Sequence, residues 1–359
     1  MSEADAAAPG SARYLLYASQ PYALAVLRPL QDAIRGAGGD AAWFFDGPGA
    51  RYLHADERRL GDVRSVKEFD PFAVFVPGNS VADFFPGLKV EVFHGFSVAK
   101  RSERAGHFRI RGLFDLYCTQ GSTTTPKFRQ LAQKYGYFGV EETGWPKVDP
   151  LFRNAAQPNP YRAGWEMSAP LVLYASTFTA RLSSAPILLD TIRELAASRR
   201  WNWLVTLHPK MPANLVRAYR ALEGPNLRFV ESDDVIPMLR AADAMVSDTS
   251  SIVHEFLLLH KPVVTLRNTV PGAHLIDIRG PLDLAGAVER ALQRPRELIE
   301  AVRVFADLIH PYRDGRSSER VLQVTHDFAE HHGTGLRRKP LCLWRKLQNR
   351  HRLGYYRLR

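Results

Sequence analysis

The 359-residue chain carries 45% hydrophobic and 11% aromatic residues, enough for real cores and, at this length, for about two domains. No apolar run approaches the ~20 residues of a membrane span, and the N-terminus (MSEADAAAPGSA) lacks a secretory-signal pattern, so we expect a soluble cytoplasmic protein. The net charge of +11 indicates an acidic partner. The two cysteines, Cys118 and Cys342, are far apart in sequence and lack the spacing of metal ligands.

Strand and helix signals alternate along the first half of the chain. Apolar runs predict strands at residues 13–18, 41–45, 73–76, 89–93 and 114–118. Apolar residues at helical spacing predict helices at residues 23–35 and 125–135. No GxGxxG follows the first strand, so the dinucleotide-binding fingerprint is absent. The alternation is typical of a doubly wound α/β domain.

A linker separates this half from a second α/β domain. Between residues 150 and 170 the periodicity is lost and Pro, Asn and Gly accumulate. After it, we expect strands at 171–175, 203–207, 227–230, 244–246 and 262–266, and helices at 185–198, 213–222, 252–259, 282–310 and 317–331. We therefore predict an N-terminal domain of residues 1–155, a C-terminal domain of residues 156–332 and a tail of residues 333–359.

The second half contains a strand, a polar turn and a helix in the stretch AADAMVSDTSSIVHEFLLLHKPVVTL, residues 241–266. The turn Ser247-Asp248-Thr249-Ser250-Ser251 lies at the carboxyl end of the strand, where open α/β sheets bind ligands. A helix N-terminus offers unpaired N–H groups to an anion, and small hydroxyl residues leave room for a phosphate. The alternative is that Asp248 or Thr249 only caps the helix.

Two histidines follow other predicted strands. His94, in Phe-His-Gly-Phe, can act as a general base because the histidine pKa lies near neutral pH. His208 stands at another strand end, in Leu-His-Pro-Lys. Taken alone, a single histidine at such a place is more often structural than catalytic.

Two further stretches place hydroxyl or basic residues at element ends. The segment YASTFT, residues 174–179, could hold a phosphate and set an aromatic ring against a base or ribose, or it could be only a turn. In YRDGRSSER, residues 312–320, Ser317 could cap the last helix while Arg316 faces an anion. Capping alone would also explain that segment.

As an ordered set, these stretches resemble the CDP-glycerol glycerophosphotransferases, which polymerise teichoic acids and related capsule polymers. The chain shows FHGFSVAK, TGWPKVD, YASTFT, LHPK, SDTSS followed by KPVV, and DGRSSER, in the order of that family, over residues 89–320. The resemblance implies a GT-B fold, with two Rossmann-like domains facing across a cleft and the donor nucleotide held mainly by the second. It also implies that an acceptor hydroxyl attacks the β-phosphorus of a CDP-activated polyol and that CMP leaves.

The resemblance also implies roles for single residues. His94 would be the catalytic base, and His208 would stabilise the phosphates and the leaving group. The residues that we expect to contact the donor are Ser176, Thr177, Lys210, Asp248, Thr249, Ser250, Ser251, Arg316 and Ser317. On the acceptor or phosphate side we expect Gly95 and Lys100. Basic groups and helix dipoles would take the place of a metal, so we expect no metal and no cofactor.

Three positions depart from the family pattern. Ser176 stands where proline is usual, Thr179 where arginine is common and Thr249 where tyrosine is common. We therefore expect the donor contacts to differ from those of the family, and a donor other than CDP-glycerol remains open. The alternatives are a GT-B glycosyltransferase or epimerase that uses a UDP-sugar, and a non-catalytic subunit of an envelope-assembly complex. The acceptor would be a glycan or lipid-linked hydroxyl.

The tail carries much of the excess positive charge. The segment GLRRKPLCLWRKLQNRHRLGYYRLR contains no acidic residue and interleaves Lys and Arg with Leu, Trp and Tyr. Such segments seek anionic lipid surfaces, so we predict a protein held peripherally at the inner face of the cell membrane. The alternative is a solvated basic helix that closes on the body. Nothing else in the chain supports nucleic-acid binding.

Overall fold

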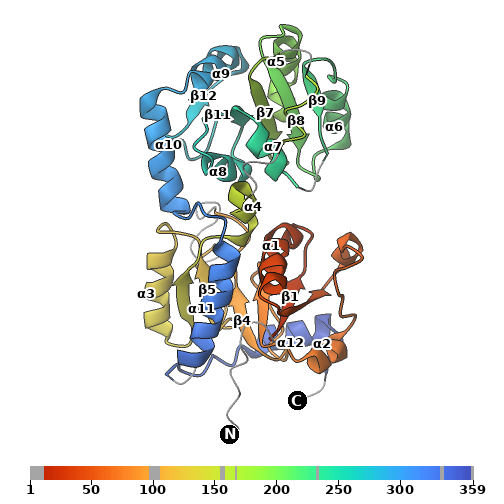
Figure 1. Ribbon diagram of the computed structural model, residues 1–359, viewed down its shortest axis with the longest axis vertical. Helices are drawn as coiled ribbons and strands as arrows, with labels where there is room; N and C mark the ends of the chain where they lie inside the picture. The colour runs from red at the N-terminus through yellow and green to blue at the C-terminus, as the bar shows by residue number, and fades with distance from the viewer. Residues whose placement is uncertain are drawn as a thin grey trace. The chain divides into compact units, whose positions relative to one another are not determined.

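The computed structural model describes residues 12–96, 106–153, 158–165, 168–231, 234–331 and 335–356. It divides into two compact units (Figure 1). Unit 1 comprises Met1–Arg153 and Ile309–Arg359, and unit 2 comprises Asn154–Leu308. The break near residue 153 lies beside the expected boundary. The chain beyond residue 308, which we expected to complete the second domain, belongs to unit 1.

The described part of unit 1 contains a six-stranded sheet in the order β2-β1-β3-β4-β5-β6, with every neighbouring pair parallel. Its strands are β1 (Arg13–Ala18), β2 (Asp40–Phe45), β3 (Ala73–Val76), β4 (Leu88–Glu91), β5 (Leu116–Thr119) and β6 (Gly139–Glu142). Most strand residues are buried, as expected for a parallel sheet covered on both faces, and the edge strand β6 is the least buried. The fourth strand ends earlier than expected because Phe93 turns into the left-handed region, with φ +59°.

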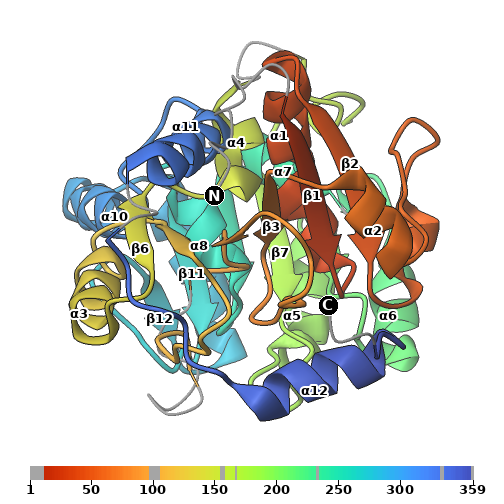
Figure 2. The same ribbon diagram turned by 90° about the horizontal axis from the view of Figure 1, so that it is seen from below.

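Helices cover both faces of this sheet (Figure 2). They are α1 (Tyr22–Gly36), α2 (Val63–Phe69), α3 (Thr125–Tyr135), α4 (Asp149–Arg153), α11 (Ser317–His331) and α12 (Leu343–Arg352), with short 3₁₀ turns η1 (Pro48–Tyr52) and η2 (Pro146–Val148). One face packs with α2 and α3 in an apolar cluster that includes Tyr17, Phe85 and Phe128. On the other face, the hydroxyl of Tyr14 in β1 lies 2.6 Å from Nε2 of His326, so α11 is bound directly to the sheet of unit 1.

The described part of unit 2 contains a second six-stranded parallel sheet, in the order β12-β11-β10-β7-β8-β9. Its strands are β7 (Leu171–Ser176), β8 (Asn202–Leu207), β9 (Leu227–Phe229), β10 (Ala244–Ser247), β11 (Val263–Leu266) and β12 (Ile276–Ile278). Its helices are α5 (Ala185–Ala197), α6 (Ala213–Arg220), α7 (Ile236–Ala241), α8 (Ile252–Leu257), α9 (Leu284–Leu292) and α10 (Arg296–Ile309), with the 3₁₀ turn η3 (Pro281–Asp283). The expectation of one long helix over 282–310 was wrong. Arg294 has φ +52° before Pro295, whose ring disfavours helical geometry in the residue ahead of it.

Each sheet has a point at which the strand order reverses. In unit 1 the chain leaves β1 towards β2 and then returns to the other side of β1 with β3; in unit 2 the same reversal lies between β7 and β10. Loops diverge at such a point and leave a crevice at the carboxyl ends of the strands, which is where open α/β sheets bind ligands. The fold therefore directs attention to the residues that follow β1, β3, β7 and β10.

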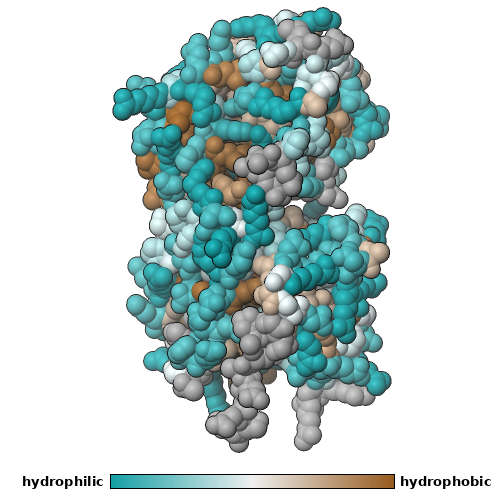
Figure 3. Space-filling view, viewed as in Figure 1, coloured by the Kyte–Doolittle hydropathy of each residue, from teal (hydrophilic) through white to brown (hydrophobic). Residues whose placement is uncertain are grey.

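The surface drawn in Figure 3 is mostly hydrophilic, with apolar side chains in separate small areas. Among the described residues, no helix has both the length and the apolar character that crossing a membrane requires. The basic tail forms α12, which belongs to unit 1.

Candidate functional site

In unit 2, a buried carboxylate organises the turn after β10. Asp248 is fully buried and accepts hydrogen bonds from Oγ of Ser176 at 2.6 Å and from the N–H of Thr177 at 3.0 Å. The N–H and Oγ of Ser184 donate to it at 2.9 and 3.0 Å. Burial raises the pKa of Asp248, and the hydrogen bonds oppose that rise. Asp248 and the buried Ser176 therefore tie the ends of β7 and β10 together.

The next residues of this turn approach the surface. Thr249 and Ser250 are half-buried and Ser251 is exposed. Oγ1 of Thr249 accepts a hydrogen bond from the N–H of Thr269 at 3.1 Å, and no side-chain hydrogen bond from Ser251 caps α8. The alternative that Asp248 or Thr249 only caps the helix is therefore wrong, because both side chains bind other segments. The three hydroxyl residues lie at the reversal point of the sheet, beside Thr177.

His208 and Lys210 follow β8, the strand next to β7. The N–H of Lys210 donates to Nδ1 of His208 at 3.0 Å, so the neutral imidazole carries its proton on Nε2. The imidazole ring lies 4.3 Å from the ring of Phe178, and Nζ of Lys210 lies 5.7 Å from the same ring. Partial burial, assisted by Lys210, lowers the pKa of His208. The arrangement offers an Nε2–H donor and an ammonium group at one strand end, which suits an anion.

In unit 1, His94 follows β4 and is held over the reversal point of that sheet. Its Nδ1 lies 2.8 Å from the carbonyl oxygen of Pro77, which directly follows β3. Because a carbonyl can only accept, Nδ1 carries the proton, and Nε2 is the basic nitrogen of the neutral ring. The ring packs at 5.1 Å on Tyr22, the first residue of the helix after β1. The side chain is exposed, and this tautomer is the one that a general base acting through Nε2 requires.

Trp145 supports the turn that carries His94. Its indole Nε1–H donates to the carbonyl oxygen of Phe93 at 3.3 Å, and its ring packs edge-on against Phe96 at 4.9 Å. Phe93 has φ +59°, a conformation that costs a non-glycine residue roughly 1–2 kcal/mol. The buried tryptophan therefore holds a strained residue immediately before the candidate base.

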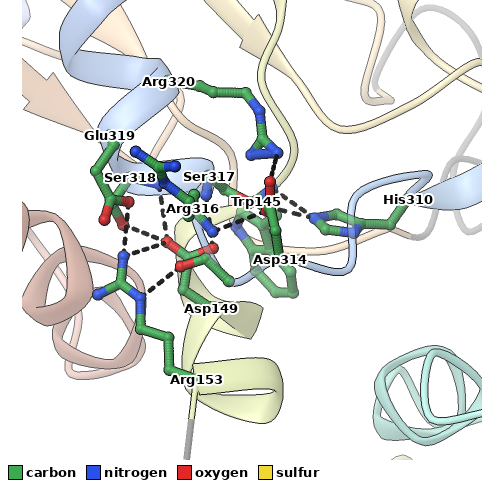
Figure 4. Close-up of polar contacts among 11 residues, drawn as sticks. Trp145, Asp149, Arg153, His310, Asp314, Arg316, Ser317, Ser318, Glu319 and Arg320 are labelled. Carbon is green, nitrogen blue, oxygen red and sulfur yellow. Dashed lines mark hydrogen bonds and ion pairs between the residues drawn. The ribbon is translucent and has the colours of Figure 1, made fainter.

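A second buried carboxylate joins this region to α11 (Figure 4). Asp149 accepts hydrogen bonds from the N–H groups of Ser317 and Ser318, both at 2.8 Å, and from Oγ of Ser318 at 2.6 Å. Arg153 donates to the carbonyl oxygen of Gly315 at 2.5 Å and to Glu319 at 2.6 Å. The motifs TGWPKVD and DGRSSER, far apart in sequence, thus form one clamp on the N-terminus of α11.

His310 completes this clamp. The backbone N–H of Trp145 donates to its Nε2 at 3.0 Å, and Oγ of Ser317 lies 3.5 Å from the same nitrogen. Burial lowers the pKa of His310 to about 4, so the ring is neutral at pH 7. Gly144 permits this close approach: it has φ +80°, and a Cβ there would lie 2.6 Å from Oγ of Ser317.

The remaining predicted residues fall at different places. Ser317 is buried, and Asp149 occupies the N–H that we expected an anion to take. Arg316 is exposed, and no described residue makes a hydrogen bond or ion pair with its guanidinium. Gly95 is half-buried, and its carbonyl oxygen accepts from Gln120 at 3.3 Å. Lys100 lies outside the described residues.

The predicted residues therefore fall into two groups. Within unit 2 the structure brings together Ser176, Thr177, His208, Lys210, Asp248, Thr249, Ser250 and Ser251 at one edge of the sheet. Arg316 and Ser317 belong instead to unit 1, with His94, and their closure on the donor anion stays a prediction. The sequence analysis did not predict Trp145, Asp149 or His310 as site residues. The only signal for the first two was their place in TGWPKVD.

The described residues contain no group of three or more His, Cys, Asp or Glu side chains that could hold a metal ion. The predictions about metal and cofactor remain expectations.

Solved structures similar to this chain share its fold. The wall teichoic acid polymerase TagF matches with a TM-score of 0.66 and 15% identity, covering 91% of each chain. An S. aureus MnaA-UDP co-structure matches with a TM-score of 0.63 and 13% identity, covering 92% of this chain and 99% of that one. A UDP-GlcNAc 2-epimerase from Neisseria meningitidis bound to UDP-GlcNAc gives 0.59 and 14%, with 87% and 98% covered. These likenesses confirm the expected GT-B fold class with two Rossmann-like units.

No match was found among curated proteins. The model of the CDP-glycerol:poly(glycerophosphate) glycerophosphotransferase family matches residues 111–326. That range is more than half of the chain and runs from β5 into α11, so it includes the clamp, the whole of unit 2 with the hydroxyl turn and His208, and part of unit 1, though not His94. The chain therefore belongs to the CDP-glycerol:poly(glycerophosphate) glycerophosphotransferase family.

Proposed function

We propose that the protein transfers glycerol phosphate, or another polyol phosphate, from a CDP-activated donor to a hydroxyl of a glycan or lipid-linked acceptor. The product would extend or prime a surface polymer of the teichoic acid or capsule kind. The observation that carries the proposal is the family match over residues 111–326. The resemblance to TagF, a wall teichoic acid polymerase, supports it at the level of fold.

The reaction can be written from groups of this chain. The acceptor hydroxyl gives its proton to Nε2 of His94 as its oxygen forms a bond to the β-phosphorus of the donor. The bond between that phosphorus and the bridging oxygen breaks, and CMP leaves with the electron pair. His94 suits this role because its Nδ1–H is held by the Pro77 carbonyl, which fixes the basic nitrogen and the orientation of the ring.

The donor diphosphate would be held by unit 2. The Nε2–H of His208 and the ammonium of Lys210 would donate to phosphate oxygens and stabilise the charge that develops on CMP. Ser250 and Ser251 would add hydroxyl donors at the reversal point of the sheet. Asp248 and Ser176 contribute by shaping that turn from within, since both are buried.

A second candidate is a glycosyltransferase or epimerase that acts on a UDP-sugar. The observation that favours it is the likeness to MnaA and to a UDP-GlcNAc 2-epimerase, both solved with a uridine nucleotide or nucleotide sugar. The same turn chemistry suits either diphosphate. The donor that the protein consumes separates the two candidates.

The test offers CDP-glycerol, CDP-ribitol and UDP-N-acetylglucosamine separately, each with crude membrane acceptor, and measures CMP and UDP release by chromatography. Release of CMP from a CDP-polyol is the expected result. His94→Ala should lower that rate about 100-fold or more, and His208→Ala about 100-fold. His54→Ala, at an exposed histidine of unit 1, is the matched control and should leave it unchanged. UDP release alone would favour the second candidate.

A third outcome concerns catalysis itself. Binding of CDP-glycerol without release of CMP, whichever acceptor fraction is added, would indicate a non-catalytic subunit of an envelope-assembly complex. Unchanged CMP release by His94→Ala would show that another group takes the proton.

We also propose that the protein works at the cytoplasmic face of the cell membrane, where lipid-linked acceptors are found. The support is the acid-free, Lys- and Arg-rich composition of residues 335–359.

A further inference from the structure

Helix α12 is docked on unit 1 through its polar side. Asn349 is buried, and its amide donates to the carbonyl oxygen of Val81 at 2.8 Å and accepts from Ser80 at 3.2 Å. Lys346 and Arg350 reach the carboxylate of Asp83 at 3.7 and 3.8 Å. These three residues lie on one face of the helix, so the docked face is made of amide and cationic groups.

Both flanks of the helix are bound to the same unit. Before it, Lys339 pairs with Asp115 at 2.6 Å. At its end, Arg352 pairs with Asp46 at 2.8 Å. Beyond it, the ring of Tyr355 stacks on Phe84 with 4.6 Å between centroids. The segment is therefore held along its length, as Figure 2 shows for α12 beside the sheet of unit 1.

The outward side of α12 carries exposed apolar residues in its first half and the polar residues Gln348, His351 and Arg352 in the rest. Leu343, Trp344 and Leu347 are 63%, 72% and 58% exposed, and they share one side of the helix at the spacing i, i+1, i+4. Leu341 just before the helix is 71% exposed, and Tyr356 just after it is 67% exposed. An amphipathic helix on a globular protein normally turns its apolar stripe to the core. Here Leu343, Trp344 and Leu347 face outward instead, and adjacent exposed apolar side chains of this kind mark a contact surface.

The chemistry around this patch favours an anionic lipid surface over a protein partner. No acidic residue occurs from 335 to 359, while Arg337 and Arg338, which precede Leu341 in the chain, are exposed. Tryptophan and tyrosine, here Trp344 and Tyr356, prefer the interface between headgroups and acyl chains. Lys346 and Arg350 are engaged by Asp83 and Arg352 is engaged by Asp46. The apolar residues therefore contribute most of the binding, and Arg337 and Arg338 contribute the charge dependence.

We propose that the outward apolar residues of α12, Leu343, Trp344 and Leu347, insert into the headgroup region of an anionic bilayer, together with the exposed flanking residues Leu341 and Tyr356. The proposal deepens the membrane location stated under the proposed function and does not depend on the donor. Since α12 is bound along its length to unit 1, the membrane would hold the unit that carries His94 directly, rather than through a loose tether.

The test is flotation of the full chain with vesicles of phosphatidylcholine alone or with 30% phosphatidylglycerol, without donor or acceptor. We expect binding to the anionic vesicles, at least 10-fold weaker binding by Leu343→Ser/Trp344→Ser/Leu347→Ser, and weaker, less salt-dependent binding by Arg337→Gln/Arg338→Gln. The matched control is Val270→Ser/Leu282→Ser, which replaces exposed apolar residues of unit 2 and should bind as the unaltered chain does. Thermal unfolding should show that each variant is folded, since these side chains lie outside the core.

Three results would overturn the proposal. One is failure of the unaltered chain to float with anionic vesicles, and another is undiminished flotation of the triple variant. The third is a dimer of the unaltered chain that the triple variant converts to monomer without any change in lipid binding, because the patch would then be an interface between copies. CMP release in solution is measured separately, so loss of the proposed enzyme activity with intact flotation would refute only the proposed reaction.

Discussion

Replacing Trp145 by phenylalanine removes one N–H from beneath the candidate base while keeping an aromatic ring in its place. The lost group donates to the carbonyl oxygen of Phe93 at 3.3 Å, and such a hydrogen bond contributes about 0.5–1.5 kcal/mol. The left-handed conformation of Phe93 costs roughly 1–2 kcal/mol. The free energy of this hydrogen bond and the strain energy of Phe93 are similar in size, so removal of the bond should let the turn adopt other conformations.

The consequence for catalysis follows from the size of that loss. Each ~1.4 kcal/mol is a factor of ten, so we expect kcat for CMP release to fall about 3- to 10-fold. The KM for the CDP-linked donor should change less than about twofold, because the residues that we assign to the donor diphosphate lie in unit 2. Urea unfolding should show a loss of about 1–2 kcal/mol.

The matched control is Trp203→Phe in unit 2. Trp203 is also fully buried, but among the described residues its indole N–H has no hydrogen-bond partner. The same substitution there should lower stability through lost packing and leave kcat nearly unchanged. If Trp145→Phe keeps kcat within about twofold while losing as much stability as Trp203→Phe, then Trp145 only fills space and does not position His94.

Three more substitutions test the structural assignments. Asp248→Asn should cost about 2–3 kcal/mol in urea unfolding, because several buried donors lose a charged acceptor. Ser251→Ala at the surface should leave stability unchanged and raise the KM for the donor. Equal stability of the two variants would contradict the assignment of Asp248 as the buried acceptor of this turn. The folded-state pKa of His310 is about 4 against an ordinary 6.5, so its stabilising effect is complete above pH 6.5 and is lost as pH falls towards 4. His310→Gln should therefore reduce the loss of stability between pH 7 and 5. An unaltered dependence of the unfolding free energy on pH in this variant would rule the assignment out. Gly315→Ala should cost about 1–3 kcal/mol, since φ is +67° and a Cβ would lie 2.7 Å from Cγ of Arg153. Gly286→Ala in α9, where the space is open, should be neutral or stabilising. Similar unfolding midpoints of the two variants would contradict the close packing of Gly315 against Arg153.

The alternation of apolar runs predicted every described strand of the two sheets except β6 and β12, and it placed most motifs at strand ends. Buried parallel strands are short apolar runs bounded by turns, and nearly all residues of β1, β7 and β10 are buried. Weakly apolar or very short elements such as α7 and β12 gave no usable signal. The break between α9 and α10 could have been anticipated from Pro295, because the residue before a proline avoids helical geometry.

The placement of α11 could not be predicted because it depends on a long-range pairing. The hydrogen bond from Ser317 to Asp149 joins positions 168 residues apart, and no local pattern reports such a contact. Chain order instead suggested that the last helix completes the second domain. For the same reason the motif TGWPKVD could be recognised without revealing that Trp145 and Asp149 contact two different segments.

The tail shows a related limit. Its composition predicted an affinity for anionic surfaces, but composition does not say which face of a helix is free. The structure shows that Asn349 and the cations next to it bind unit 1 and that Leu343, Trp344 and Leu347 point outward. Removal of residues 335–359 would therefore also strip Tyr355 from Phe84 and break several ion pairs, so truncation would mix a loss of stability with any loss of lipid binding.

The two units build their motif turns on the same principle. In each, one fully buried aspartate accepts hydrogen bonds from backbone N–H groups and hydroxyls: Asp149 of α4 binds the start of α11, and Asp248 after β10 binds the end of β7 and the residues that follow it. Burial raises the pKa of both carboxyl groups, and in neither case does the side chain reach the surface. The residues suited to chemistry are their neighbours at the surface, such as Ser251 and Arg316.

The difference between the buried aspartates and the surface residues next to them decides how a loss of activity should be interpreted. A substitution at either aspartate removes an acceptor from several buried donors, so it should lower stability and activity together. A substitution at His94, whose side chain is exposed and held by a backbone carbonyl, should lower activity while the unfolding midpoint stays near that of the unaltered chain. Measuring the unfolding midpoint and CMP release on the same variants therefore separates residues that build the turns from residues that act on the substrate.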